Sequence, residues 1–198
     1  MRLAPIIGAL SIVAGVYHYW NFREFVRAPG ILVSEVPEQS SPLENAKPII
    51  IENAVLDPLT TYKLKARVLS TERYWIDNGA KIAPIDIAVG WGPASDSELL
   101  DKLTIRQAGR FYFFSWSGEA PADPRVIGLN SANIHVIPAN KFISDEVKKL
   151  RKGDLITLSG YLVRANFRDG SDWKSSLTRE DSGNGACELM YVQSILKQ

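Results

Sequence analysis

The sequence is poor in the residue types that build metal sites and covalent cross-links. It has one cysteine, Cys187, and two histidines among 198 residues. A single cysteine excludes an intramolecular disulfide and a zinc site made of cysteine ligands. Because no second ligand stands at a metal-binding spacing from His135, we expect no metal ion and no cofactor.

An excess of charge of one sign is also missing. The chain has 23 Lys and Arg residues against 22 Asp and Glu residues, so its formal net charge is +1. A protein that holds nucleic acid through the phosphates normally has a strong basic excess, which disfavours this class. The basic run at residues 148–152 is explained by the end of a predicted helix.

The short motifs of easily recognised enzymes are absent from the sequence. It contains no P-loop, dinucleotide-binding fingerprint, nucleophile elbow or HExxH zinc motif. It also has no internal repeat and no low-complexity segment. These absences exclude the enzyme classes that such motifs mark, and they leave open whether the chain is an enzyme of another class.

A long apolar stretch covers residues 3–20 and ends in Tyr17, Tyr19 and Trp20, as at the aromatic belt of a membrane helix. We predict an uncleaved single-pass transmembrane helix within residues 1–22. The alternative is a signal peptide with a poor cleavage site. Positive charges are nearly balanced on the two sides, and we favour a domain outside the cytoplasm, which a topology reporter fused at the C-terminus would test.

The remaining chain is expected to form a connector followed by one globular domain. Residues 23–58 are rich in proline and are typical of an extended connector, although the apolar runs at 31–36 and 49–51 could add edge strands. Residues 59–198 are long enough for a single hydrophobic core.

Alternating and apolar patterns predict strands through this domain. Residues 60–68 alternate with a period of two, and residues 85–91 are apolar on both faces except at Asp86. Residues 110–116 form a dense aromatic run. Further strands are predicted at residues 155–164, 173–177 and 187–195, and the Asp169-Gly170 pair predicts a hairpin turn.

The clearest local pattern is a strand, a helix and a second strand within residues 131–163. Ser144 is predicted to cap the helix, on which Ile143, Val147 and Leu150 share one apolar face that must pack on a sheet. The same order surrounds the helix of small barrels such as the oligonucleotide/oligosaccharide-binding (OB) fold. We therefore predict a mainly β (α+β) fold, a partly open OB-like β-barrel with one or two short helices.

A second short helix is predicted after the Gly-Pro break at residues 92–93. Ser95 and Glu98 have the spacing of a capping box, which places the start of the helix at this point. Residues 178–186 are too polar and too rich in glycine to form regular structure.

His135 and Cys187 could form a catalytic pair. A histidine can activate a cysteine thiol for nucleophilic attack, and Asn133 or Asp86 could orient its ring. The alternative is that His135 is a hydrogen-bonded residue of the barrel wall and Cys187 a small buried hydrophobic residue. The sequence does not show whether the two side chains meet.

The polar segment after the predicted hairpin supplies further candidates. Arg179 could clamp a carboxylate or a phosphate, and Asp181 or Glu188 could act as a general base. Ser175 and Ser176 are candidate binding residues in the same segment. The alternative is an ordinary surface loop whose polar side chains satisfy its own backbone.

Two more candidates flank the Gly-Pro break. Trp91 could stack a sugar or a base, together with the aromatic run at 111–116, and Asp96 is a candidate binding residue beside it. Aromatic residues at strand spacing are, however, more often part of a core.

Three segments carry a resemblance: WGPASD (91–96), SANIHVIPA (131–139) and SSLTREDSGNGACE (175–188). With them, the chain resembles an uncharacterised bacterial family of membrane-anchored proteins over most of residues 66–192. The resemblance implies a bacterial protein tethered to the inner membrane. It implies no activity, cofactor or catalytic residue.

The favoured hypothesis is a single-pass envelope protein whose β-rich domain binds a partner protein or a glycan. It predicts a groove with exposed tryptophan or tyrosine and no convergent polar centre. The first alternative is a hydrolase or transferase with Cys187 as nucleophile, His135 as base and Arg179 as substrate clamp, with the first two within about 3–4 Å. The second is an OB-like domain that binds single-stranded nucleic acid.

Overall fold

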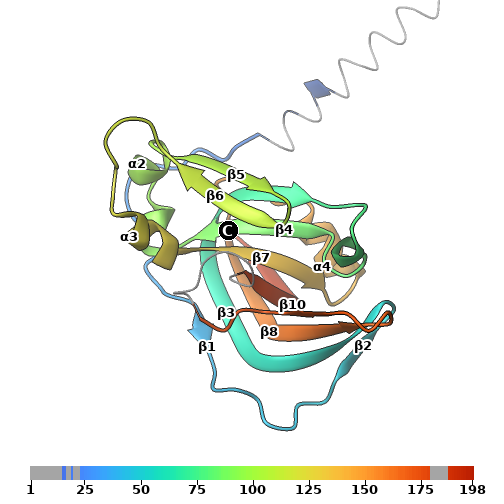
Figure 1. Cartoon of the computed structure of the whole chain (residues 1–198). Coiled ribbons are helices and arrows are strands. Elements are labelled where there is room, and N and C mark those ends of the chain that lie inside the picture. The colour runs from blue at the N-terminus through green and yellow to red at the C-terminus, as the bar shows by residue number, and fades with distance from the viewer. Residues whose placement is uncertain (1–14, 17–18, 20–22, 179–186) are drawn as a thin grey trace, which may run out of the picture.

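The computed structural model describes residues 15–16, 19, 23–178 and 187–198 of the chain. Strands dominate this part, as predicted, and eight of them belong to one curved sheet (Figure 1). The predicted transmembrane helix within residues 1–22 lies almost wholly outside the described residues. Among the described residues, no helix is long and apolar enough to cross a membrane.

Five strands follow one another around a ring-like sheet. They pair in the order β3 (Ala54–Arg73), β4 (Ile85–Gly90), β7 (Ser131–Pro138), β10 (Glu188–Lys197) and β8 (Leu155–Phe167), and β8 pairs again with β3. The β7–β10 pair is parallel and the others are antiparallel. β7 and β10 pair only between Glu188 and Val192 of β10, so the ring is not closed along its whole length.

β3 can serve two neighbours because it is long and bent. Its first part pairs with β8 up to Arg67, and from Arg67 onward it pairs with β4. The register shifts between Pro58 and Thr60 and again between Val68 and Ser70. Such bulges increase the local bend and twist of a strand, which lets one strand turn from one partner to the next.

The main hydrophobic core takes residues from all five strands of the ring and therefore fills its interior. The helix α4 (Lys141–Val147) packs against it, and Ile143, Val147 and Leu150 are all buried, which confirms the predicted apolar face. The predicted cap was wrong. Asn140 caps the helix by accepting the backbone N–H of Ile143 at 3.0 Å.

The segment predicted as a connector is part of the domain. Val33 is 1% exposed and belongs to the main core. The strands β1 (Glu38–Gln39) and β2 (Ile49–Ile51) both pair with β3, which confirms the edge strand expected at residues 49–51. Residues 31–36 form no strand, and the N–H of Val33 instead donates to Oγ of Ser95 at 3.1 Å.

The part of the chain that joins β4 to β7 forms a second layer outside the ring (Figure 1). It consists of η2 (Gly92–Ser95), α2 (Ser97–Leu100), the hairpin β5 (Thr104–Ala108) and β6 (Phe111–Ser115), and α3 (Pro124–Leu129). Asp96 caps α2 in place of the predicted Ser95, by accepting the N–H of Glu98 at 2.9 Å. The sequence did not predict β5 or α3, because the apolar residues of these segments do not recur with a clear strand or helix period.

The remaining short elements are η1 (Asn78–Lys81), in the loop between β3 and β4, and β9 (Asp172–Lys174). β9 pairs with β8 after a turn at Gly170, which has a φ of +86°, and this confirms the predicted hairpin. Gly79 of η1 and Trp173 of β9 line the same cavity.

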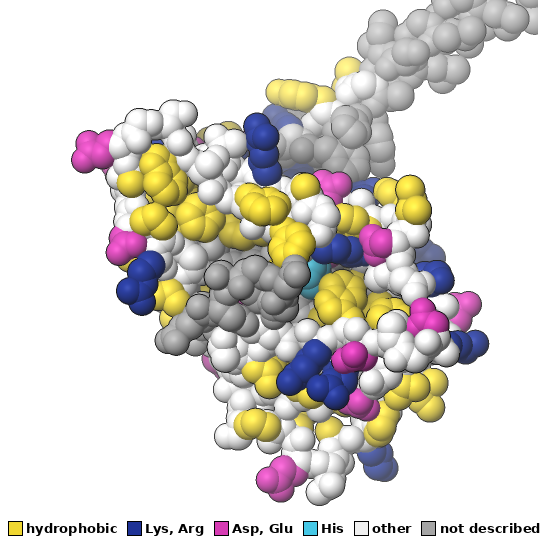
Figure 2. Space-filling view, in the orientation of Figure 1, with side chains coloured by type: hydrophobic (Ala, Val, Ile, Leu, Met, Phe, Trp, Pro, Cys, Tyr) yellow, Lys and Arg dark blue, Asp and Glu magenta, His cyan; other side chains and the backbone are white. Residues whose placement is uncertain are grey.

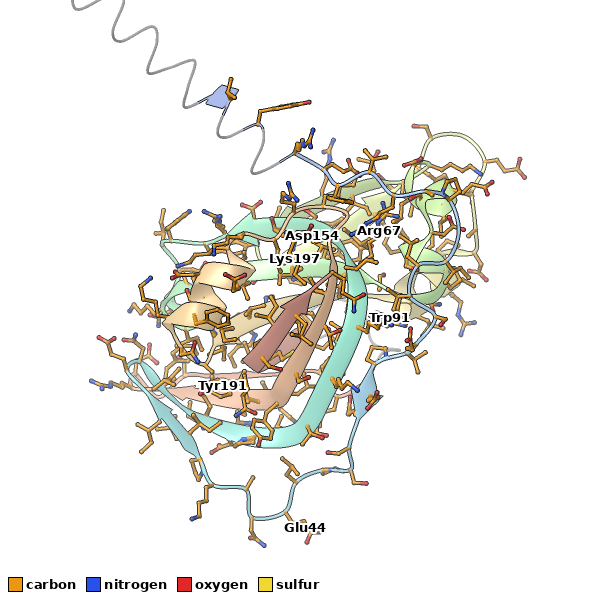
Figure 3. The ribbon with its side chains drawn as sticks, turned by 180° about the vertical axis from the view of Figure 1, so that it is seen from behind. Glu44, Arg67, Trp91, Asp154, Tyr191 and Lys197 are labelled. Carbon is orange, nitrogen blue, oxygen red and sulfur yellow. The ribbon has the colours of Figure 1, made fainter. Side chains whose placement is uncertain are left out.

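Residues 25–27 cross one end of the ring and fasten it. The N–H of Phe25 donates to the carbonyl of Lys152 at 2.8 Å, and Nε of Arg27 donates to the carbonyl of Gly153 at 3.0 Å. Asp154 and Lys197 form an ion pair of 2.6 Å at this end (Figure 3). A Cβ atom at Gly153 would clash with the carbonyl oxygen of Phe25, so this close approach requires glycine.

Replacing Gly153 by Ala is expected to destabilise the protein more than replacing Gly170 by Ala. The two glycines have φ angles of +90° and +86°, so both variants lose about 1–2 kcal/mol through backbone strain. Only Gly153 has a neighbour that a Cβ would strike, and overpacking adds about 1–3 kcal/mol. Urea unfolding measures both losses. Equal losses would mean that Phe25 does not pack on Gly153 in solution.

Candidate functional site

A cavity of about 490 Å³ opens on the outer face of β4 and β7. Figure 2 shows the described histidine (cyan) within it, among hydrophobic and basic side chains. The lining comes from five parts of the chain: the β3–β4 loop (Tyr74, Asp77, Gly79), the β5–β6 hairpin (Gly109, Arg110, Phe111), β7 (His135), β9 (Trp173) and the residue before β10 (Cys187).

The strand register brings Asp86 and His135 together. They are directly opposite each other in the β4–β7 pair, and their sequence neighbours Ile85, Ile87 and Ile134 point into the core. Side chains alternate between the two faces of a strand, so Asp86 and His135 both point outward. Oδ1 of Asp86 lies 2.9 Å from Nδ1 of His135, and the two side chains are only 0% and 3% exposed.

Arg110 is fixed between two carboxylates. Its Nη1 lies 2.9 Å from Oδ1 of Asp86, and its Nη2 lies 2.7 Å from Oδ1 of Asp77. Nη1 also donates to the carbonyl of Ala83 at 2.8 Å, and the guanidinium carbon stands 3.8 Å from the ring centroid of Tyr74. Charge-assisted hydrogen bonds and a cation–π contact therefore hold this cation in one orientation.

Two side chains of the β3–β4 loop, Asp77 and Tyr74, have shifted pKa values. Burial raises the pKa of Asp77, but the hydrogen bond and charge of Arg110 lower it further, so the pKa lies below its ordinary value. Burial raises the pKa of Tyr74, whose hydroxyl accepts the backbone N–H of Arg110 at 3.1 Å. At neutral pH Asp77 is therefore an anion and Tyr74 is a neutral phenol.

Cys187 lies beside a second polar group on the same face. Sγ of Cys187 is 3.8 Å from Nδ2 of Asn133, and the same Nδ2 donates to the carbonyl of Arg110 at 3.0 Å. Nε2 of Gln107 donates to Oδ1 of Asn133 at 2.8 Å. This bond fixes the orientation of the amide, with Nδ2 on the side of the sulfur and of the Arg110 carbonyl. Asn133 is 4% exposed, so this amide is held in a nearly buried position.

Trp173 forms the aromatic wall of the cavity. Its ring packs on the ring of His135, with the two centroids 4.6 Å apart and an interplanar angle of 53°. The guanidinium carbon of Arg110 lies 5.6 Å from the Trp173 ring. Together with Tyr74 and Phe111, Trp173 gives the cavity three aromatic side chains around its polar floor.

The structure brings together several residues named from the sequence. His135 and Cys187 line one cavity, and Oδ1 of Asp86 lies 2.9 Å from Nδ1 of His135. The cavity therefore combines aromatic walls with a cluster of polar side chains. Arg110 was missed, and its only sequence signal was an arginine directly before an aromatic strand.

Other predicted site residues have structural contacts instead. Trp91 is 1% exposed and belongs to the main core, so it is not available to stack a ligand (Figure 3). Oδ1 of Asp96 accepts the N–H groups of Gly30 and Glu98, at 2.8 and 2.9 Å, and so fastens the N-terminal segment to α2.

The candidates of the polar segment are buried or lie outside the described residues. Oγ of Ser175 accepts the N–H of Leu189 at 3.0 Å, and Oγ of Ser176 donates to the carbonyl of Thr178 at 2.9 Å. Both serines therefore satisfy backbone groups, and Glu188 is 5% exposed at the start of β10. Arg179 and Asp181 lie outside the described residues.

The arrangement offers an acid–histidine pair, a thiol and a fixed cation inside aromatic walls. Among the residues that the structure describes, no group of three or more His, Cys, Asp or Glu residues could hold a metal ion. No family model matches the sequence, and no curated protein or solved structure matches the chain.

Proposed function

We propose that the chain is a binding module that holds a saccharide in the cavity on the β4–β7 face. The observation that carries this proposal is the lining of the cavity, where aromatic side chains surround fixed polar groups. Ligand sites typically combine apolar and aromatic walls with a few well-placed polar groups. Trp173 and Phe111 would pack on the flat face of a sugar ring, and Arg110 and Asp77 would meet its hydroxyls.

The strand order supports an OB-like barrel. The order β3-β4-β7-β10-β8, the parallel β7–β10 pair and the position of α4 between β7 and β8 correspond to the five-stranded Greek-key barrel of that fold. In OB folds, oligonucleotides and oligosaccharides bind on the face of the second and third strands, between the loops that join strands 1–2 and 4–5.

The cavity occupies the equivalent place in this chain. The second and third strands of the ring along the chain are β4 and β7, which carry Asp86 and His135. The two corresponding loops lie between β3 and β4 and between β8 and β10, and they supply Asp77 and Trp173. The position of the cavity therefore supports ligand binding.

The charge of the site favours a neutral ligand over nucleic acid. Arg110, the one Lys or Arg among the described lining residues, is already paired with Asp77 and Asp86. Phosphate binding draws its affinity from Lys and Arg residues that exchange counterions for phosphates. A neutral ligand that presents hydroxyl groups suits the exposed Asp77 and an already paired guanidinium better than a polyanion does.

Replacing Trp173 by Ala is expected to weaken saccharide binding about tenfold, because one aromatic wall of the cavity is lost. Titration calorimetry of the full chain with neutral oligosaccharides of glucose, galactose and N-acetylglucosamine measures this effect. Trp75→Ala is the matched control, since Trp75 is 77% exposed in the β3–β4 loop and is not among the lining residues.

Two results would contradict the saccharide proposal. One is wild-type affinity in Trp173→Ala. The other is binding of single-stranded oligonucleotides in preference to every saccharide, with an affinity that falls steeply as salt is added, which would instead support a nucleic-acid-binding OB domain.

A further inference from the structure

We propose that Cys187 is a nucleophile in this cavity and that His135 activates it for acyl transfer from an ester or amide group of the bound ligand. The identity of the ligand as a saccharide rests on the proposed function, in which case the acyl group is carried by one of its hydroxyl or amino groups. The activity itself is argued from the positions of four side chains.

Cys187 and His135 are diagonal neighbours on one face of the parallel β7–β10 pair. Leu189 of β10 lies opposite His135, and Glu188 lies opposite Ile134, so continuing the register places Cys187 beside Asn133. Residues two apart along a strand share a face, so Cys187, Asn133 and His135 lie on the same face of the sheet. Both residues line the same cavity.

Asp86 and Cys187 approach His135 from opposite sides, because β4 and β10 are the two neighbours of β7 in the sheet. Nδ1 of His135 lies 2.9 Å from Oδ1 of Asp86, close enough for the carboxylate to hold the ring by charge, although Nδ1 makes no hydrogen bond of good geometry among the described residues. A proton on Nδ1 would leave Nε2 as the basic nitrogen of the ring. A buried carboxylate on one side and a thiol on the other give His135 the environment of a general base.

Asn133 places a hydrogen-bond donor at the sulfur. One N–H of its amide donates to the carbonyl of Arg110, and Nδ2 lies 3.8 Å from Sγ of Cys187. Gln107 holds the amide in this orientation by donating to Oδ1 at 2.8 Å. The thiol of Cys187 donates to the carbonyl of Arg110 at 3.8 Å. Once this proton has been removed, the N–H of Asn133 can stabilise the thiolate, and it can also stabilise the oxyanion that forms on the carbon attached to sulfur.

The reaction needs only water as a second reactant. Nε2 of His135 takes the thiol proton, and the thiolate of Cys187 forms a C–S bond with the acyl carbon while the carbonyl π pair moves to oxygen. When this intermediate collapses, the bond to the leaving alcohol or amine breaks, and His135 returns its proton to the leaving group. Water then attacks the thioester, loses a proton to His135 and releases the acid, while the departing sulfur regains a proton.

The rate of alkylation of Cys187 by iodoacetamide, measured against pH in the native full chain, tests the activation. We expect a midpoint at least one unit below the ordinary thiol pKa of about 8.5. In His135→Gln the midpoint should return to about 8.5, and the rate at pH 7 should fall at least about tenfold. The same chain in urea supplies the unactivated reference, so the wild-type result stands even if the variant folds poorly.

A wild-type midpoint at or above the urea reference would overturn the proposal, as would an unchanged midpoint in a folded His135→Gln variant. Acyl transfer itself is tested with p-nitrophenyl acetate. We expect a rapid release of about one equivalent of p-nitrophenolate per chain and an acetyl group on Cys187 by mass spectrometry. Cys187→Ser should abolish both.

The two proposals fail separately. If the wild-type chain binds saccharides but releases no p-nitrophenolate, the nucleophile is refuted and the binding module stands. If Cys187 is acetylated but no saccharide binds, the acyl-transfer site stands and its ligand belongs to another class.

Discussion

Replacing Asp86 by Ala is expected to lower the free energy of unfolding by about 3 kcal/mol or more. Asp86 is 0% exposed and stands at 2.9 Å from both Arg110 and His135. Removing one partner of a buried pair leaves the other charge without compensation, which typically costs about 3–5 kcal/mol. Since the Arg110 side chain is 17% exposed, we expect the lower part of that range.

Asp77→Ala is the matched control, because Asp77 pairs with the same guanidinium. Its side chain is 45% exposed, and exposed ion pairs contribute about 0–1 kcal/mol. Urea unfolding of both variants separates the effect of burial from the effect of charge. If the two losses were equal, the burial of Asp86 would not determine its contribution, and the site would be more open in solution than in the structure.

Trp91→Ala is expected to lower the free energy of unfolding by about 3–5 kcal/mol, because truncation of a large core side chain leaves a cavity. Trp91 is 1% exposed and packs in the core that fills the ring. Trp75→Ala removes the same side chain from a position that is 77% exposed, and its effect should stay within about 0.5 kcal/mol.

The Trp91 variant also tests the role that the sequence suggested for this residue. Its stability is measured by urea unfolding, and its saccharide affinity is measured at a temperature where it remains folded. A variant of wild-type stability that no longer binds saccharide would show that Trp91 contacts the ligand. A destabilised variant with unchanged affinity would confirm its place in the core.

The strands with strong local patterns could be predicted from the sequence. The apolar run of β4, the aromatic run of β6 and the Asp169-Gly170 turn each have one favourable local conformation. Helix boundaries were less certain, because Asn140 and Ser144 can both cap a helix and only the tertiary packing selects the first. Val33 was assigned to the connector because a single buried valine does not form the repeating apolar pattern that predicts a strand or a helix.

The site was predicted in part. His135 and Asp86 were recognisable as polar residues within apolar runs, and Cys187 as the single thiol. Their meeting depends on strand register, since Asn133 and Cys187 are 54 residues apart in sequence and come together only through the parallel β7–β10 pair. Arg110 could not be predicted, because its position depends on a positive φ of 72° at the turn between β5 and β6.

The position of β10 in the sheet has a consequence for the synthesis of the protein. β10 lies between β7 and β8, yet it leaves the ribosome after both of them. Until it arrives, β7 and β8 are open edges, which favour pairing with other chains. Insertion of β10 between them is the step that covers both edges. Cys187 directly precedes this strand, so it also leaves the ribosome after Asp86 and His135, which lie on β4 and β7.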